Sequence, residues 1–166
     1  GLEPLGYHLL SVLAHLASAL LLFAVARRLL GADWPAVLAG LLLAVHPIHS
    51  EPVNLISARN TLLAAACMLG SYLAWLRGRE PGQRGSDAAA ALLYGIGLLC
   101  KETALMLLPF LVLSELLPAE GPRLATLRRR APELGAFAGL AIAYLALRAA
   151  VLPSVLGERV PAGHLA

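Results

Sequence analysis

Apolar residues fill six blocks of this chain, separated by short polar clusters that contain charged residues, proline or glycine. The blocks predict six helices, at about residues 5–26, 35–46, 55–76, 88–100, 104–117 and 134–152. An α-helix rises about 1.5 Å per residue, so about 20 apolar residues cross a hydrocarbon core about 30 Å thick. The second block is too short to span unless neighbouring polar residues extend it. The pattern predicts an all-α, multi-pass transmembrane helical bundle.

The composition supports a membrane environment. Hydrophobic residues make up 59% of the chain and charged residues only 14%, and the mean hydropathy of +0.76 is high for a soluble domain. The net charge of +3 is small, and the arginines lie in short loops rather than in a stripe with aromatic residues, so we expect no nucleic-acid partner. The chain begins at Gly1 without a visible signal peptide. We therefore expect residues 1–166 to be one partial transmembrane domain, with the lipid bilayer as its partner.

The basic residues predict an orientation. Nine of the thirteen lie in the loops after the first, third and fifth blocks: Arg27, Arg28, Arg77, Arg79, Arg84, Arg123, Arg128, Arg129 and Arg130. The positive-inside rule places these loops in the cytoplasm. The opposite face, which is extracytoplasmic or lumenal, receives Arg59, Lys101, Arg148 and Arg159. The alternation is consistent over all six predicted helices.

A candidate site lies on the extracytoplasmic face. The segment 46–60 is the densest polar group outside the basic loops, and the junction after the fourth block returns to the same side, so Arg59 and Lys101 are expected to converge there. Ionisable groups near hydrocarbon cost several kcal/mol unless they are paired or hydrated. Two cations kept beside Glu51 and Glu102 indicate a bound anion, and a lipid phosphate would suit.

The histidines leave other interpretations open. Arg59 could pair with Glu51 while Lys101 extends to the interface and the histidines only cap the second helix. His46, His49 and Glu51 could instead bind a metal ion, but they do not form the HExxH pattern. A divalent metal is thus the less favoured alternative, and we expect no required cofactor. In the first helix, His15 is expected to form a hydrogen bond within the bundle, and His8 lies near enough to the site to contribute a donor.

Four segments of the chain carry a resemblance to a known family. They are Tyr7-His8-Leu9-Leu10 with His15, the HPIHSEPV segment at 46–53, the ISARNTLL segment at 56–63 and the KETALMLLP segment at 101–109. In this order they resemble the transmembrane and tetratricopeptide-repeat O-mannosyltransferases and their bacterial relatives, which belong to the GT-C glycosyltransferases. The resemblance covers about residues 4–117. Its most specific parts are HPxHxEPV and the Lys-Glu pair followed by an apolar run that ends in proline.

The resemblance implies an enzyme that transfers a mannose-like sugar from a polyprenyl-phosphate donor to a protein or glycan hydroxyl on the extracytoplasmic or lumenal side. It implies a many-helix membrane domain of GT-C fold, often followed by tetratricopeptide repeats, in the bacterial inner membrane or the endoplasmic reticulum. The match places the contact with the donor phosphate on Lys101. The other residues expected to bind substrate are Arg59, His49, His46, Glu102 and His8.

The resemblance also places the catalytic acid in a first long extracytoplasmic loop upstream of the matched region, so the fragment is expected to be inactive alone. Glu51 is the best remaining carboxylate within this chain. The competing prediction is a non-catalytic membrane scaffold or lipid-binding bundle. A transporter is not favoured, because the polar residues gather at one interface rather than at the membrane midplane.

Overall fold

A computed structural model describes residues 4–49, 53–55, 58–80, 82–117 and 127–151. Over these residues the chain is helical and has no strand, which confirms the all-α class. The longer helices are α1 (Pro4–Leu30), α2 (Asp33–Val45), α4 (Arg59–Arg77), α5 (Arg84–Cys100), α6 (Leu107–Leu116) and α8 (Ala131–Val151). Two short 3-10 helices, η1 (Pro47–His49) and η3 (Glu102–Met106), follow α2 and α5.

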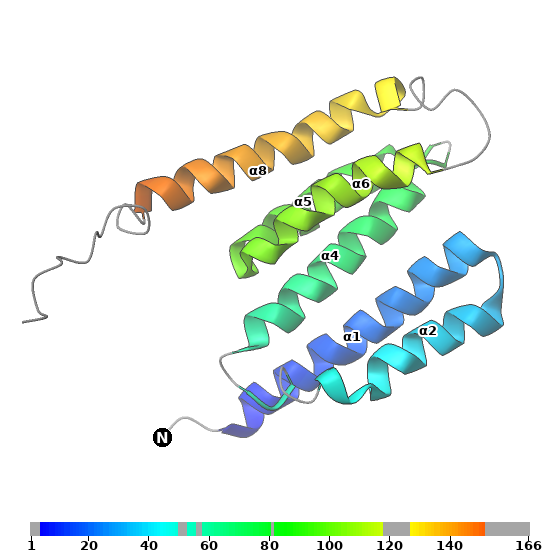
Figure 1. Ribbon diagram of the computed structural model, residues 1–166, viewed down its shortest axis with the longest axis vertical. Helices are drawn as coiled ribbons and strands as arrows, with labels where there is room; N and C mark the ends of the chain where they lie inside the picture. The colour runs from blue at the N-terminus through cyan, green and yellow to red at the C-terminus, as the bar shows by residue number, and fades with distance from the viewer. Residues whose placement is uncertain (1–3, 50–52, 56–57, 81, 118–126, 152–166) are drawn as a thin grey trace, which may run out of the picture.

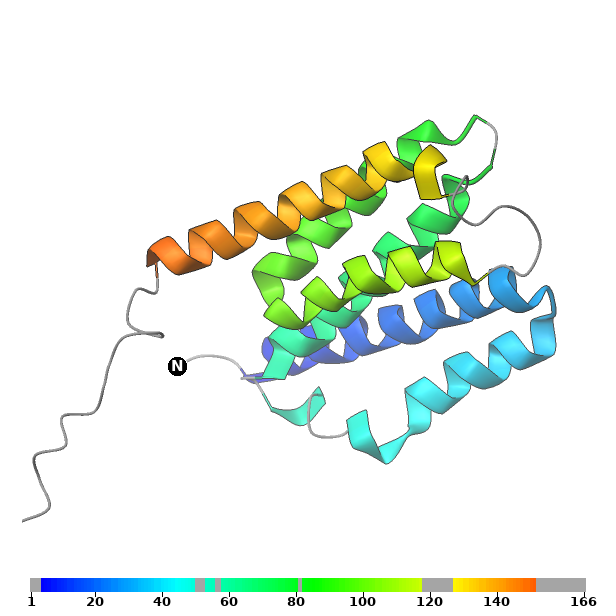
Figure 2. The same cartoon turned by 45° about the horizontal axis from the view of Figure 1, so that its top comes forward.

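The helices run back and forth between two ends of the molecule (Figures 1 and 2). α1 and α2 form a hairpin, α4 packs between α1 and α5, and α8 lies against α5 and α6. One end holds the last turns of α2, α5 and α8 with the first turns of α1, α4 and α6, and is called the Lys101 end here. The other end holds the opposite terminus of each helix and is called the Glu115 end.

The core lies where α4, α5, α6 and α8 meet. Trp75, Tyr94, Leu111 and Phe137 are its largest fully buried side chains. The ring of Phe137 stacks on Tyr94 at 4.9 Å between centroids and meets Trp75 edge-on at 5.6 Å. Aromatic pairs of this kind contribute about 0.5–1.5 kcal/mol beyond their buried area. This aromatic cluster therefore fixes how α8 packs on the centre of the bundle.

Small residues allow neighbouring helices to approach closely. A Cβ atom added at Gly97 of α5 would lie 3.3 Å from the Cβ atom of Cys67 in α4, and one added at Gly40 of α2 would lie 3.2 Å from the Cβ atom of Phe23 in α1. The buried Ser71 hydroxyl donates a hydrogen bond of 2.7 Å to the carbonyl oxygen of Ala90, which joins α4 to α5. Small residues at crossings and hydroxyl bonds between helices are typical of packing in a membrane.

The outside of the bundle is rich in large apolar side chains, for example Leu20 at 59% exposure and Ile142 at 67%. Two helical segments, Gly6–Leu30 and Ala131–Val151, are long and apolar enough to cross a membrane, with hydropathies of 2.3 and 1.8. The helices Asp33–Val45 and Gly85–Cys100 are apolar but shorter. That the remaining helices also belong to a multi-pass domain of GT-C fold stays a prediction.

The helix ends differ from the expected ones by a few residues. α1 continues past Arg27 and Arg28 to Leu30, because it is Gly31 that ends it, with a φ of +64° and an N–H that bonds the carbonyl oxygen of Arg27 at 3.0 Å. α4 begins at Arg59 rather than near residue 55, and α5 begins at Arg84 rather than near residue 88. The block expected at 104–117 begins as the 3-10 helix η3 before it becomes α6.

Candidate functional site

Lys101 lies where the chain reverses between α5 and η3. Its backbone is extended, with φ −159° and ψ 138°, and its N–H bonds the carbonyl oxygen of Gly97 at 2.9 Å, which ends α5. The half-buried ammonium group donates a hydrogen bond of 2.7 Å to the hydroxyl of Thr61 in the first turn of α4. An ammonium group has three N–H donors, so Thr61 leaves capacity for a ligand.

Arg59 opens α4 two residues before Thr61. Its guanidinium Cζ lies 4.6 Å from the centroid of the Tyr7 ring in α1, a cation–π contact. Its Nε is buried and has no hydrogen-bond partner among the described residues. The structure thus places Arg59 and Lys101 at the same end of the bundle, where Arg59 contacts α1 and Lys101 contacts the first turn of α4. Within the described part of the chain neither cation forms an ion pair with a carboxylate.

Glu102 is not the partner of these two cations. Its carboxylate pairs instead with the guanidinium of Arg148 in the last turns of α8, which also hydrogen-bonds the Tyr144 hydroxyl at 3.2 Å. Glu102 adjoins Lys101 in the chain, and its expected part in substrate binding stays a prediction. Among the described residues, α8 supplies the cation that pairs with Glu102, and no carboxylate pairs with Lys101.

The histidines have different surroundings. His46 is the C-cap of α2 through its backbone N–H, which bonds the carbonyl oxygen of Leu42, and its Nδ1 accepts a hydrogen bond of 3.2 Å from the N–H of Ile48 in η1. The Nε2 of His15 lies 3.1 Å from the carbonyl oxygen of Ala44 and links α1 to α2, as predicted. His8 is exposed near the start of α1, at the Lys101 end.

The remaining predicted ligands cannot be placed at the site. His49 lies in η1, but its side chain, like all of Glu51, is outside the described residues. Over the residues that the structure describes, no three His, Cys, Asp or Glu side chains are grouped to hold a metal ion. The metal interpretation depends on His49 and Glu51 and stays a prediction.

An apolar groove runs beside this end of the molecule. It lies between α5 and α8, has a volume of about 510 Å³, and is lined by residues that include Leu98, Leu99, Tyr144 and Leu147. Leu99 is two residues before Lys101, and Leu147 adjoins Arg148, so the groove approaches the charged groups of the Lys101 end. An arrangement of this kind suits a ligand with an anionic head and a long apolar chain.

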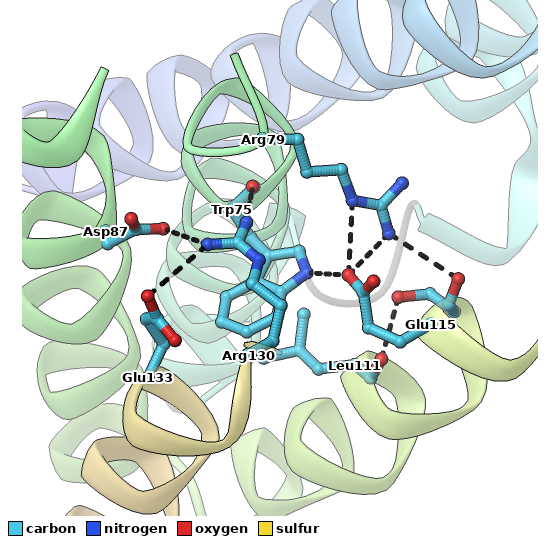
Figure 3. Close-up of polar contacts among 8 residues, drawn as sticks. Trp75, Arg79, Asp87, Leu111, Glu115, Arg130 and Glu133 are labelled. Carbon is cyan, nitrogen blue, oxygen red and sulfur yellow. Dashed lines mark hydrogen bonds and ion pairs between the residues drawn. The ribbon is translucent and has the colours of Figure 1, made fainter. Parts of the chain in front are cut away.

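Sequence reasoning missed a buried polar network at the Glu115 end (Figure 3). The Glu115 side chain in α6 is only 3% exposed. Its carboxylate accepts hydrogen bonds from the indole nitrogen of Trp75 at 2.8 Å and from Nε and Nη2 of Arg79 at 3.1 and 2.6 Å. A single acid inside the apolar run 104–117 was the available signal, since an acid buried in such a helix requires a partner.

Arg130, which immediately precedes α8, is the second centre of this network. The buried guanidinium donates to Asp87 at 3.0 Å and to the carbonyl oxygen of Trp75 at 3.1 Å, and its Cζ lies 4.3 Å from the Trp75 ring centroid. Glu133 lies 3.9 Å away. The arginines that the sequence assigned only to topology therefore also tie α4, α5, α6 and α8 together (Figure 3).

The dolichyl-phosphate-mannose-protein mannosyltransferase family matches residues 4–147. The chain is 40% identical over 111 residues to protein O-mannosyl-transferase Tmtc2 of Drosophila melanogaster, which covers 63% of this chain and 12% of that protein. It is 39% identical over 121 residues to Tmtc1 of Drosophila melanogaster (73% and 14%) and 30% identical over 123 residues to TMTC3 of Homo sapiens (72% and 13%). This chain thus spans only a small part of these relatives, and no solved structure matches it.

Proposed function

Since this chain belongs to the dolichyl-phosphate-mannose-protein mannosyltransferase family, we propose that it forms part of a membrane glycosyltransferase with a polyprenyl-phosphate sugar as donor. The sugar is mannose-like and the acceptor is a hydroxyl of a protein or glycan. The names of the relatives, which are protein O-mannosyl-transferases, support sugar transfer to protein. The Lys101 end would then face the extracytoplasmic or lumenal side of a bacterial inner membrane or the endoplasmic reticulum.

One observation carries the proposal. Lys101 holds a half-buried ammonium group at the end of α5, bonded only to the neutral Thr61 among the described residues, while Arg59 lies at the same end. A sugar phosphodiester has one negative charge, and the polyprenyl phosphate that leaves has up to two. Cations at this position interact more strongly with the leaving group than with the donor, and this difference lowers the barrier of the reaction.

The apolar groove between α5 and α8 would hold the first part of the polyprenyl chain. Its lining is almost entirely hydrocarbon, and it includes Leu99 and Leu147, which lie close in the chain to Lys101 and Arg148. The Arg148–Glu102 ion pair would then mark the boundary between the chain and the phosphate. His46, His49 and His8 come from segments at the same end and would contact the sugar or the phosphate as hydrogen-bond donors.

The acceptor hydroxyl must lose a proton as it attacks the sugar, and a carboxylate is the usual base for this step. We assign it to a carboxylate outside the described residues, in a loop upstream of this chain, with Glu51 as the candidate within it. The part of Lys101 and Arg59 is to bind the phosphate and to stabilise its growing charge. No metal ion takes part in this scheme.

The test uses the full-length protein that contains this chain. Lys101→Ala is expected to lower kcat for transfer from a polyprenyl-phosphate mannose by about 100-fold or more, the size found when one donor to a developing anion is removed. Lys101→Arg should recover part of the rate because it restores the charge. Arg59→Ala is measured in the same way.

Two control variants separate chemistry from folding. Thr61→Val removes the hydrogen bond to Lys101 but keeps the charge of Lys101, so it should lower kcat much less than Lys101→Ala does. Arg128→Gln removes an exposed charge at the Glu115 end and should leave kcat for sugar transfer unchanged. Unchanged kcat and KM in a folded Lys101→Ala protein would refute the role of Lys101. A wild-type protein that binds the donor but transfers nothing would favour the scaffold instead.

A further inference from the structure

A second positively charged site lies at the Glu115 end, away from the proposed donor site. It is a cavity of about 390 Å³ between the last turns of α1 and α4. Three of its lining residues are arginines, namely Arg27 and Arg28 of α1 and Arg77 of α4. Figure 1 shows the ends of these two helices at the same end of the bundle.

The charges around this cavity are unbalanced. Arg27 pairs with Asp33 at 2.6 Å and Arg28 with Glu80 at 2.7 Å, but neither acid lines the cavity. Within the described part of the chain, Arg77 forms no ion pair with any acid. Exposed ion pairs hold weakly in water, and each guanidinium has five N–H donors, so all three arginines retain capacity for a ligand. The lining favours an anion.

The rest of the lining is apolar. Phe23 and Ala24 of α1 and Leu73 of α4 lie about one helical turn further from the Glu115 end than the arginines. α1 belongs to a segment, Gly6–Leu30, that is long enough to cross a membrane, so the arginines would lie at headgroup depth and the apolar residues at the depth of the first acyl carbons. A free phosphate ion would contact only the arginines, whereas a phospholipid would contact the arginines with its headgroup and the apolar residues with its acyl chains.

We propose that this cavity binds the phosphate headgroup of an anionic phospholipid and that the lipid joins α1 to α4. The leaflet would be the cytoplasmic one, because the loops rich in arginine lie at this end and anionic lipids concentrate in that leaflet. α1 and α4 also position Tyr7 and Arg59 at the opposite end, so the bound lipid would stabilise the helix pair that presents Arg59. The inference requires the membrane setting but not sugar transfer.

The experiment measures lipid retention by the full-length protein. The protein is reconstituted into nanodiscs of phosphatidylcholine with increasing phosphatidylglycerol, extracted in mild detergent and analysed by native mass spectrometry. The wild type should retain phosphatidylglycerol in preference to phosphatidylcholine. Arg77→Gln should weaken this retention about fivefold, the effect of one basic residue near an anionic surface, and Arg77→Lys should weaken it less.

Arg128→Gln is the matched control, because it removes one exposed arginine at the same end but outside the cavity. Arg28→Gln, on the other helix, is a second variant in case Arg77→Gln does not fold. Equal losses in the Arg77 and Arg128 variants would overturn the proposal, as would equal retention of the two lipids by the wild type. Displacement of the lipid by millimolar inorganic phosphate would also overturn it, in favour of a soluble anion. Donor binding at Lys101 should be detectable in every variant, which separates this result from a failure of the proposed function.

Discussion

The buried Glu115 carboxylate provides a direct test of what holds this bundle together. Glu115→Ala removes the acceptor of the Trp75 indole N–H, and Trp75 has no solvent exposure to replace that bond. An unsatisfied buried donor costs about 1–3 kcal/mol. Arg79 loses its partner as well, but its side chain is 31% exposed and can turn towards water, so its share is small. The expected loss is about 3 kcal/mol in the free energy of unfolding.

Two further variants set the scale of this loss. Glu115→Gln keeps an oxygen that can accept from Trp75 but loses the charge opposite Arg79, so it should cost about 1 kcal/mol. Glu80→Gln breaks an ion pair whose side chains are 34% and 51% exposed, and it should cost less than about 1 kcal/mol. The order of stability is therefore wild type, Glu80→Gln, Glu115→Gln and Glu115→Ala.

The assay is unfolding of the full-length protein in mixed micelles with an increasing fraction of denaturing detergent, followed by circular dichroism. Amide hydrogen exchange locates the change, which should appear first where α4 and α6 meet at the Glu115 end. A Glu115→Ala protein within about 0.5 kcal/mol of Glu80→Gln would refute the reasoning. The carboxylate would then not be an essential partner of Trp75.

Two further predictions concern the groove and the metal question. Gly95 lines the groove between α5 and α8 and has open space around it, so Gly95→Leu should weaken donor binding without loss of folded protein. Gly97→Leu should instead destabilise the fold by about 1–3 kcal/mol, because Gly97 lies in close contact with α4. If the two variants had equal effects on donor affinity and on stability, the assignment of the groove would be contradicted. Treatment with EDTA should leave sugar transfer unchanged, and a loss that one divalent ion restores would instead support metal ligands in segment 46–51.

The contacts in the structure divide the basic residues between the two ends of the bundle in the same way as the count of basic residues in each predicted loop. Arg28, Arg79 and Arg130 have their partners at the Glu115 end, while Arg59 and Lys101 have theirs at the Lys101 end. This agreement is expected physically, because helices joined by short loops reverse direction at each connection. Which end faces the cytoplasm stays a prediction from the positive-inside rule.

The sequence by itself determined the helices, the end of the bundle at which Arg59 and Lys101 lie, and the family. These properties can be predicted because helix formation and hydropathy depend on contiguous residues. In addition, helices joined by short loops must reverse direction at each connection. The contact of the His46 imidazole is local in the same way, because its partner, the N–H of Ile48 in η1, is only two residues away.

Only the tertiary structure decided which charges pair. Glu102 and Arg148 are separated by 46 residues, and Glu115 and Trp75 by 40, so their contacts depend on the order in which the helices pack. That order places α8 beside α5 and brings α6 against the end of α4, which gives each acid a partner that no local pattern indicates. The buried charge of Glu115 is stable only with such a partner, and packing between distant segments selects it.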